Sequence, residues 1–253
     1  MKPKEKFSRK NIAVILARKR SHRLKDKHLI IVDGKPLIQY TFEYALQSRQ
    51  LDDVVCSTDS DEIASLAESF GIDVIKRPSK FARDDSPIIE AMEYTLLRYG
   101  RRQGQLPQTA IILYGNVPYR GSRISQGLEL FHKKNADAVF TACEVGKYNP
   151  EWMFKTDKTN RMIFDKDTLN CRCQDLPVYY TATDSFIIAR TQRLLSRPHR
   201  RSLYSDFGDS IFFVEEERNS TIDVDDIYDL NYFRFLVSDK NRSSRLSYWK
   251  KGE

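Results

Sequence analysis

The sequence predicts an α/β fold in which a mostly parallel sheet lies between two layers of helices. Short apolar runs alternate with segments whose apolar residues recur at helical spacing, a rhythm typical of β-α units. At 253 residues the chain is long enough to bury a large core, and it shows no internal repeat or low-complexity tract. We therefore expect a single domain over 1–253, with its core at about 11–237 and basic tails at both ends.

The first half of the chain contains the clearest elements. NIAVIL is continuously apolar, like a buried strand. VDGKP then forms a turn, and Pro36 suits the first position of a helix that continues from Leu37. A later helix has Ser or Asp at its start and Gly71 at its end. Strands are predicted at 11–16, 53–56, 72–78 and 109–114, helices at 37–45, 57–71 and 86–100, and a linker at 101–108.

In the second half the alternation continues to Tyr148 and then loosens. Short apolar runs separated by polar stretches indicate a small inserted hairpin, followed by the last strands of the sheet. IYDLNYFRFLV has the content of a closing helix. The predicted elements are a helix at 121–134, a strand at 136–145, short runs at 162–164, 185–189 and 211–214, and a helix at 227–237.

Basic residues concentrate at the start of the chain. The formal net charge is +7, but residues 1–30 contribute +9 and the remainder −2. This distribution fits a local anion site or a basic arm better than a surface that binds nucleic acid over its whole extent, so we do not expect nucleic acid as a partner. No apolar run approaches the roughly 18 residues that span a membrane, and the first residues do not resemble a signal peptide, so we expect a cytoplasmic protein without membrane contact.

The basic segment ARKRSHRLKDK directly follows the first predicted strand. In open α/β sheets, ligands bind beyond the carboxyl ends of strands, where Arg18, Arg23 and Lys27 would meet phosphate oxygens. The alternative is a solvated basic turn, which is the commoner origin of charge runs. The segment contains neither GxxxxGK[ST] nor GxGxxG, so a P-loop and a dinucleotide-binding site are both disfavoured.

Two further segments carry candidate site residues. Asp223 and Asp225 alternate in IDVDDIYDL, so their carboxylates would point the same way and could share one Mg²⁺. Asp226 and Asp229 are expected to cap the first turn of the closing helix. Taken alone, this segment is better explained by four capping or solvent-exposed acids than by a metal site. In ILYGNVPYR, a strand ends at Gly115 and Asn116, which would hold a base or sugar or simply form a turn. The four histidines form no ligand cluster, and no catalytic triad can be inferred.

Taken together, these segments resemble the nucleotide-sugar cytidylyltransferases, most closely the acylneuraminate cytidylyltransferases (CMP-sialic acid synthetases). The likeness covers roughly 11–237, with its motifs in the family's order. The matching motifs are A-R-x-x-S-x-R-L-x-x-K at Ala17–Lys27, G-K-P-L-I at Gly34–Ile38, V-x-S-T-D-x-x-E-I-A at Val55–Ala64, R-P at Arg77–Pro78, acidic Asp84 and Asp85, and D-V-D-x-x-x-D-L at Asp223–Leu230.

The resemblance implies a three-layer, Rossmann-like fold of the nucleotide-diphospho-sugar transferase type, and a homodimer. It implies a reaction in which a nonulosonic acid attacks the α-phosphate of CTP. By the same resemblance, Arg18 and Lys27 would be catalytic and Asp223 and Asp225 would hold Mg²⁺. The remaining roles would be nucleotide binding by Arg18, Ser21, Arg23, Lys27, Arg77, Tyr114 and Asn116, and sugar binding by Arg172, Gln174 and Phe186.

The sequence departs from the family pattern in four places. The glycine pair after Arg18 is Lys19-Arg20, a base-contacting glutamine is Tyr114, the acidic position of the Kdo-type relatives is Asn116, and an Asn-Gly near the sugar site is Ala182-Thr183. Two alternatives therefore stay open: a related nucleotidyl- or glycosyl-transferase that uses another nucleotide, and a catalytically degenerate member that binds nucleotide or RNA.

Overall fold

The computed structural model describes residues 6–83, 86–163, 172, 175–196 and 204–238. Its main sheet has seven strands in the order β11-β7-β10-β6-β1-β4-β5. The strands are β1 (Phe7–Ala17), β4 (Asp53–Thr58), β5 (Asp73–Lys76), β6 (Leu106–Tyr114), β7 (Ala138–Glu144), β10 (Tyr180–Arg190) and β11 (Ile211–Glu215). Neighbours are parallel except where β10 meets β6 and β7, so the predicted mostly parallel sheet is confirmed.

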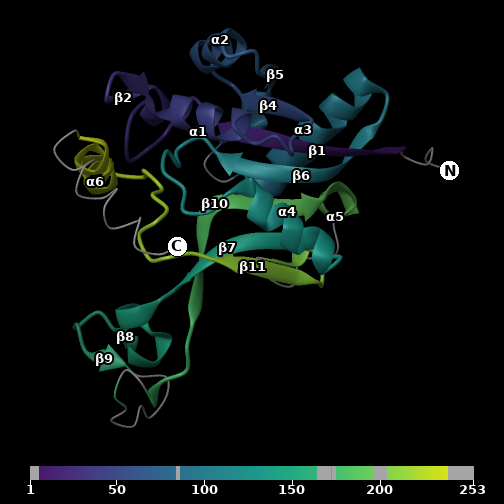
Figure 1. The fold of residues 1–253 in the computed structure, drawn as a ribbon. Helices are drawn as coiled ribbons and strands as arrows, with labels where there is room; N and C mark the ends of the chain where they lie inside the picture. The colour runs from purple at the N-terminus through teal and green to yellow at the C-terminus, as the bar shows by residue number, and fades with distance from the viewer. Residues whose placement is uncertain (1–5, 84–85, 164–171, 173–174, 197–203, 239–253) are drawn as a thin grey trace.

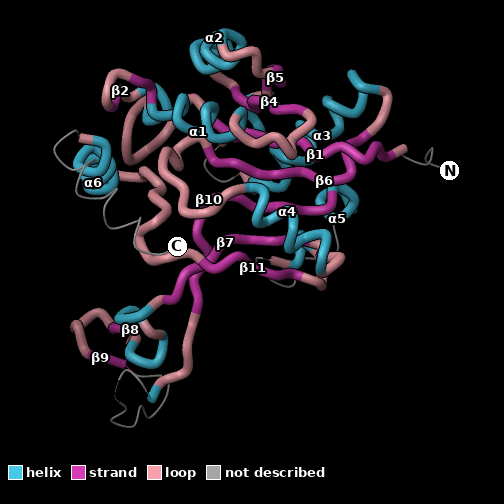
Figure 2. Tube along the Cα trace, in the orientation of Figure 1, coloured by secondary structure: helices cyan, strands magenta, loops and turns pink. Residues whose placement is uncertain are grey.

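Helices cover both faces of this sheet (Figures 1 and 2). They are α1 (Leu37–Leu46), α2 (Asp61–Ser69), α3 (Ile88–Gln103), α4 (Ile124–Lys133) and α5 (Thr191–Ser196). A sixth helix, α6 (Ile227–Val237), lies beside the sheet and packs in a separate apolar cluster with Val32, Leu37 and Ile222. Apolar side chains of α1, α2 and α4 form one core with the sheet, and those of α3 and α5 form a second core on the opposite face. The predicted three-layer architecture is therefore confirmed.

The predicted linker at 101–108 is wrong. Helix α3 continues to Gln103 because Arg101 and Arg102 are good helix formers, and Gly104 ends it with a left-handed φ of 75°. Strand β6 begins two residues later at Leu106, where its start pairs with Phe7 of β1. A short turn at Gly104 therefore joins the helix to the strand where the sequence predicted an eight-residue linker.

Two smaller features flank the sheet. The hairpin β2 (Ile31–Val32) and β3 (Lys35–Pro36) turns at Asp33-Gly34, which both have positive φ, and α6 packs near it with Phe233 against Tyr40 at 5.1 Å between rings. The inserted hairpin, β8 (Lys155–Thr156) and β9 (Met162–Ile163), lies on an arm that projects away from the sheet (Figure 1). None of the helices within the described ranges is long and apolar enough to cross a membrane.

Candidate active site

Several polar side chains gather at the edge of the sheet where the parallel strands end. Arg18 follows β1, Asp59 follows β4, Arg77 follows β5 and Asn116 follows β6. Strand β10 runs in the opposite direction, so its first half brings Asp184 to the same edge. Ligand sites of open α/β sheets lie at such an edge.

A cleft of about 270 Å³ opens there. Of the predicted site residues, those that line it are Arg18, Lys27, Arg77, Tyr114, Asn116 and Asp225. Ser21 is half-buried on the same basic segment but does not line the cleft, and Arg23 is exposed and reaches Asp225 from outside it. The chain segments that surround the cleft are far apart in the sequence, and only the strand order brings them together.

The aspartate segment is held in place by the loop after β6. The backbone N–H of Ile222 donates to the Tyr119 carbonyl at 2.9 Å, and that of Val224 donates to the Asn116 carbonyl at 2.9 Å. This extended pairing turns Asp223 and Asp225 to one side. The Asn116 amide donates to both carboxylates, at 3.3 Å in the case of Asp225 Oδ1.

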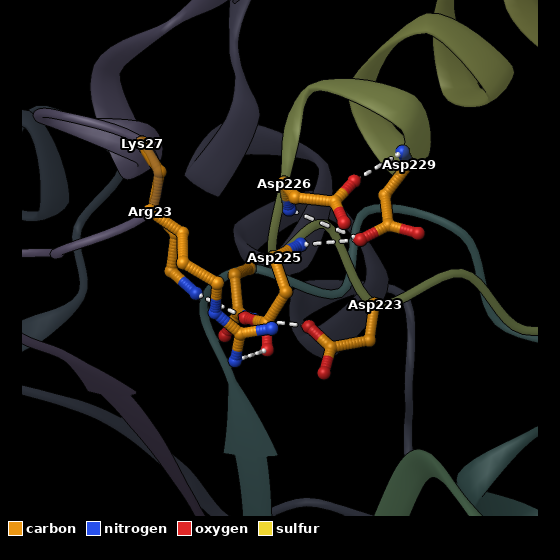
Figure 3. Close-up of polar contacts among 7 residues, drawn as sticks. Arg23, Lys27, Asp223, Asp225, Asp226 and Asp229 are labelled. Atoms are coloured by element: carbon orange, nitrogen blue, oxygen red, sulfur yellow. Dashed lines mark hydrogen bonds and ion pairs between the residues drawn. The ribbon is translucent and has the colours of Figure 1, made fainter. Parts of the chain in front are cut away.

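Asp226 and Asp229 have the capping role that the sequence predicts. The Asp226 carboxylate accepts from the backbone N–H groups of Tyr228 and Asp229 at the start of α6. Asp229 Oδ2 accepts from the backbone N–H groups of Asp225 and Asp226, each at 3.0 Å (Figure 3). This capping box fixes the backbone of Asp225 relative to the helix.

Asp223 and Asp225 differ in charge although they lie two residues apart. Burial first, and then the charges of Asp225 and Asp184, raise the pKa of Asp223 to about 7. Burial also pushes the pKa of Asp225 upward, but the hydrogen bond and charge of Lys27 and the charge of Arg23 outweigh it, so this pKa lies below its usual value. One carboxylate is therefore ionised and paired, and the other is held near its protonation point.

Cations surround Asp225. Lys27 Nζ lies 2.7 Å from Oδ1, and the Arg23 guanidinium lies 2.6 Å from Oδ2 (Figure 3).

Arg77, whose pKa is lowered chiefly by burial, is 9% exposed, and its Nε has no hydrogen-bond partner within the described part of the chain. A buried guanidinium nitrogen without an acceptor, on a residue that lines a cleft, is suited to an anionic ligand.

The loop after β1 accommodates Lys19 and Arg20 without a glycine pair. Neither residue has a positive φ, and both are exposed. The backbone N–H of Lys19 donates to Asp59 at 2.7 Å, while its ammonium lies 3.6 Å from Glu62 on α2. Neither residue lines the cleft, and the hydrogen bond to Asp59 fixes the backbone of the loop at Lys19.

Sequence analysis did not identify three polar residues at this edge: His28, Arg120 and Asp184. His28 is 3% exposed and packs so closely on Gly115 that an added Cβ there would lie 2.9 Å from its ring. Burial, followed by the charge of Lys27, lowers its pKa to about 3, so the ring is neutral at pH 7. Arg120 donates to the carbonyls of Tyr114, Val117 and Ser185, which makes it part of the scaffold.

The two predicted sugar-binding residues that the structure describes, Arg172 and Phe186, do not line the cleft. Arg172 is exposed and pairs with Asp175 at 2.9 Å. Phe186 is 1% exposed and packs in the core against Gly127 of α4, so its position provides no contact with a ligand. Gln174, like Asp84 and Asp85, lies outside the described residues.

Comparison with known proteins adds a family and several relatives. Residues 12–114 match the family model described as cytidylyltransferase. The pseudaminic acid cytidylyltransferase of Campylobacter jejuni is 29% identical, over 93% of this chain and 99% of that protein. The CMP-N,N'-diacetyllegionaminic acid synthase of Legionella pneumophila is 28% identical, over 79% and 89%. The N-acylneuraminate cytidylyltransferase of Escherichia coli is 28% identical, over 92% of this chain but 53% of that protein.

Solved structures share the fold at lower identity. A CMP:2-keto-3-deoxy-manno-octonic acid synthetase complexed with CTP superimposes with a TM-score of 0.68 at 19% identity, covering 91% of this chain and 99% of that one. A 4-diphosphocytidyl-2C-methyl-D-erythritol synthase superimposes with a TM-score of 0.62 at 12% identity, with the same coverage. This chain therefore shares its overall fold with these two enzymes.

Proposed function

This chain belongs to the cytidylyltransferase family, and on that premise we propose that it transfers CMP from CTP to a nonulosonic acid. The observation that carries the proposal is the cleft itself, which Arg18 and Lys27 of the basic segment and Arg77 after β5 line together with Asp225. Asp223 does not line the cleft, but its carboxylate shares the Asn116 amide with that of Asp225. Such an arrangement suits a polyanion whose charge is shared between fixed cations and a metal ion.

In the proposed reaction, a hydroxyl oxygen of the sugar acid attacks the α-phosphorus of CTP. A new P–O bond forms, the bond to the bridging oxygen of the β-phosphate breaks, the hydroxyl proton is released, and pyrophosphate leaves. Catalysis of this type depends mostly on positioning and on charge neutralisation. Arg18, Lys27 and Arg77 would hold the triphosphate in line with the incoming hydroxyl. Tyr114, whose pKa is raised by burial and by Asp184, would stay neutral and donate to the base.

Asp223 and Asp225 fit a magnesium ion. Burial and mutual repulsion keep a proton on Asp223 up to about pH 7, and a divalent cation would remove that repulsion. The described residues contain no group of three or more His, Cys, Asp or Glu that could hold a metal. Two carboxylates completed by phosphate and water are, however, the usual protein contribution to a Mg²⁺ site. When bound, the ion would neutralise phosphate charge and lower the pKa of the attacking hydroxyl.

A homodimer is part of the proposal. The arm that carries β8 and β9 exposes large apolar side chains, including Tyr148, Met153, Phe154 and Met162, each at least 49% exposed. Several exposed apolar side chains on one projecting element favour association, and a second copy of the chain would cover them symmetrically. Measuring the molar mass in solution tests this part, and a monomer at micromolar concentration would contradict it.

The function is tested by pyrophosphate release from purified protein with Mg²⁺, each common nucleoside triphosphate in turn, and a panel of nonulosonic acids. Release with CTP and one sugar acid is the expected result, and it would identify that acid. Release with another nucleotide would reject the cytosine assignment. Folded protein that binds CTP but turns over no pair would favour the degenerate binding protein instead.

A further inference from the structure

We propose that Lys27 and Arg23 are an internal counter-ion for Asp225, which they must leave before a divalent cation binds there. The inference rests on the proposed function, because that function has basic side chains of the site bind the triphosphate and the Asp225 carboxylate bind the metal ion. It predicts the order in which the ligands bind. The metal ion binds together with the triphosphate, and the nucleotide-free protein binds the metal ion only weakly.

Both oxygens of Asp225 are occupied in this structure. Lys27 Nζ lies 2.7 Å from Oδ1 and the Arg23 guanidinium 2.6 Å from Oδ2, while the Asn116 amide adds a third donor at 3.3 Å from Oδ1. The Lys27 side chain is 10% exposed and that of Asp225 is 30% exposed, so water screens this pair less than a surface ion pair. Three donors thus take three of the roughly four lone-pair sites of this carboxylate, and because two of them are cations, a metal ion at Asp225 would also meet like charge.

The carboxylate is fixed, whereas one cation is free to move. The backbone N–H of Asp225 is bound by Asp229 at 3.0 Å in the capping box of α6 (Figure 3). The Arg23 side chain is 66% exposed and lies on the loop between β1 and the short helix at Lys27–Leu29. A long, mostly exposed guanidinium can exchange partners at low cost.

A triphosphate provides the stronger partner. Lys27 lines the same cleft as Arg18 and Arg77, so phosphate oxygens in that cleft would compete directly with Asp225 for its ammonium. Once Lys27 and Arg23 turn to phosphate, Asp225 is left with a negative charge that the accompanying metal neutralises. Because the same cations oppose one ligand and favour the other, their removal must change the two affinities in opposite directions.

The test is a Mn²⁺ titration of nucleotide-free protein, followed by the electron paramagnetic resonance signal of free Mn²⁺. We expect Lys27→Met, which keeps the volume of the side chain, to bind Mn²⁺ about tenfold more tightly than wild type. Lys25→Met is the matched control, since Lys25 is exposed on the same loop and is not among the partners of Asp225 in the described ranges; it should change the affinity less than about twofold. A parallel CTP titration should show weaker nucleotide binding by Lys27→Met.

Two results would overturn the inference: equal Mn²⁺ affinities of Lys27→Met and Lys25→Met, or a gain that survives in the double variant Lys27→Met/Asp225→Asn. If Lys27→Met does not fold, Arg23→Met decides, because its exposed side chain can be removed without disturbing the core; we expect about a threefold gain, and no gain counts against the inference. The metal titration uses no nucleotide, so failure of wild type to turn over CTP would reject the proposed function and leave this result independent.

Discussion

The nucleotide half and the sugar half of the proposed site are built differently. The nucleotide half takes side chains from the ends of β1, β5 and β6 and from the segment before α6, and most are at least partly buried around one cleft. In the sugar half, Arg172 is exposed in a surface ion pair and Phe186 belongs to the core.

This difference has a physical reason. A triphosphate must be held at several oxygens at once, which requires cations fixed by the ends of a rigid sheet. A surface arginine paired with a neighbouring acid contributes little binding energy and is easily replaced. We therefore expect the phosphate-binding residues to dominate activity, and Arg172, which does not line the cleft, to have at most a small effect on the use of the sugar acid.

The largest effect is expected at the aspartate pair. Asp225→Asn should lower turnover with CTP by about 100-fold or more at 1 mM Mg²⁺, because it removes a metal ligand and the partner of two cations. Asp226→Asn is the control, since asparagine caps a helix as well as aspartate does. Equal turnover of the two variants, measured by pyrophosphate release, would remove Asp225 from the site.

Arg77 tests the nucleotide half separately. Arg77→Met should raise the KM for CTP by about 10- to 100-fold, because a charge-assisted contact with phosphate is lost, and should leave the KM for the sugar acid nearly unchanged. Steady-state kinetics with each substrate varied in turn measures both constants. A rise confined to the KM for the sugar acid would show that Arg77 acts on the sugar acid and not on CTP.

Asp223 should make the metal-free protein less stable as the pH rises. Its folded pKa of about 7 lies above the unfolded value near 3.9, so the stability present at low pH is lost as the pH increases toward 7. Asp223→Asn avoids this loss, and its advantage in the free energy of unfolding over wild type should be about 2–3 kcal/mol larger at pH 8 than at pH 5. Urea unfolding with a chelator measures it, and an advantage independent of pH would refute the assignment.

Arg172 should give a small effect, confined to the sugar acid. Arg172→Ala should change the KM for that substrate about threefold or less and leave the KM for CTP unchanged, because its pair with Asp175 lies on the surface. Kinetics with saturating CTP tests this. A rise in the KM for the sugar acid as large as the rise in the KM for CTP that is expected of Arg77→Met would contradict the proposed difference between the two halves.

The smallest effect is expected in the loop after β1. Lys19→Gly and Arg20→Gly restore the glycines of the family pattern, yet neither backbone position needs a positive φ and both side chains point outward. Turnover should change less than about twofold. A large gain in kcat with either variant would mean that these side chains do crowd the phosphates.

Much of the fold could be predicted from the sequence, because local signals and the global structure agree. Continuous apolar runs marked β1 and β6, and Ser60 caps α2 as the motif predicts. The direction of β10 could not be predicted, because an apolar run indicates a strand but not whether that strand is parallel or antiparallel to its neighbours. The end of α3 was missed because one glycine, not the polar run before it, stops the helix.

For the site, sequence reasoning found single residues but not their pairing. Lys27 and Asp225 are separated by 198 positions, and only the strand order shows that they touch. His28 follows Lys27 directly, yet nothing local indicates that it is buried beside Gly115. The roles of Mg²⁺, the homodimer, the single domain and the cytoplasmic location stay predictions.

The most direct test of the nucleotidyl transfer is ³¹P NMR of wild-type protein with CTP, Mg²⁺ and pseudaminic acid or a related nonulosonic acid. The proposed function predicts one phosphodiester signal of a CMP-sugar for each pyrophosphate formed, and neither signal when the sugar acid is omitted. Release of inorganic phosphate with CDP, or pyrophosphate with free CMP and no phosphodiester, would contradict it, because the cleft would then hydrolyse the nucleotide instead of transferring it.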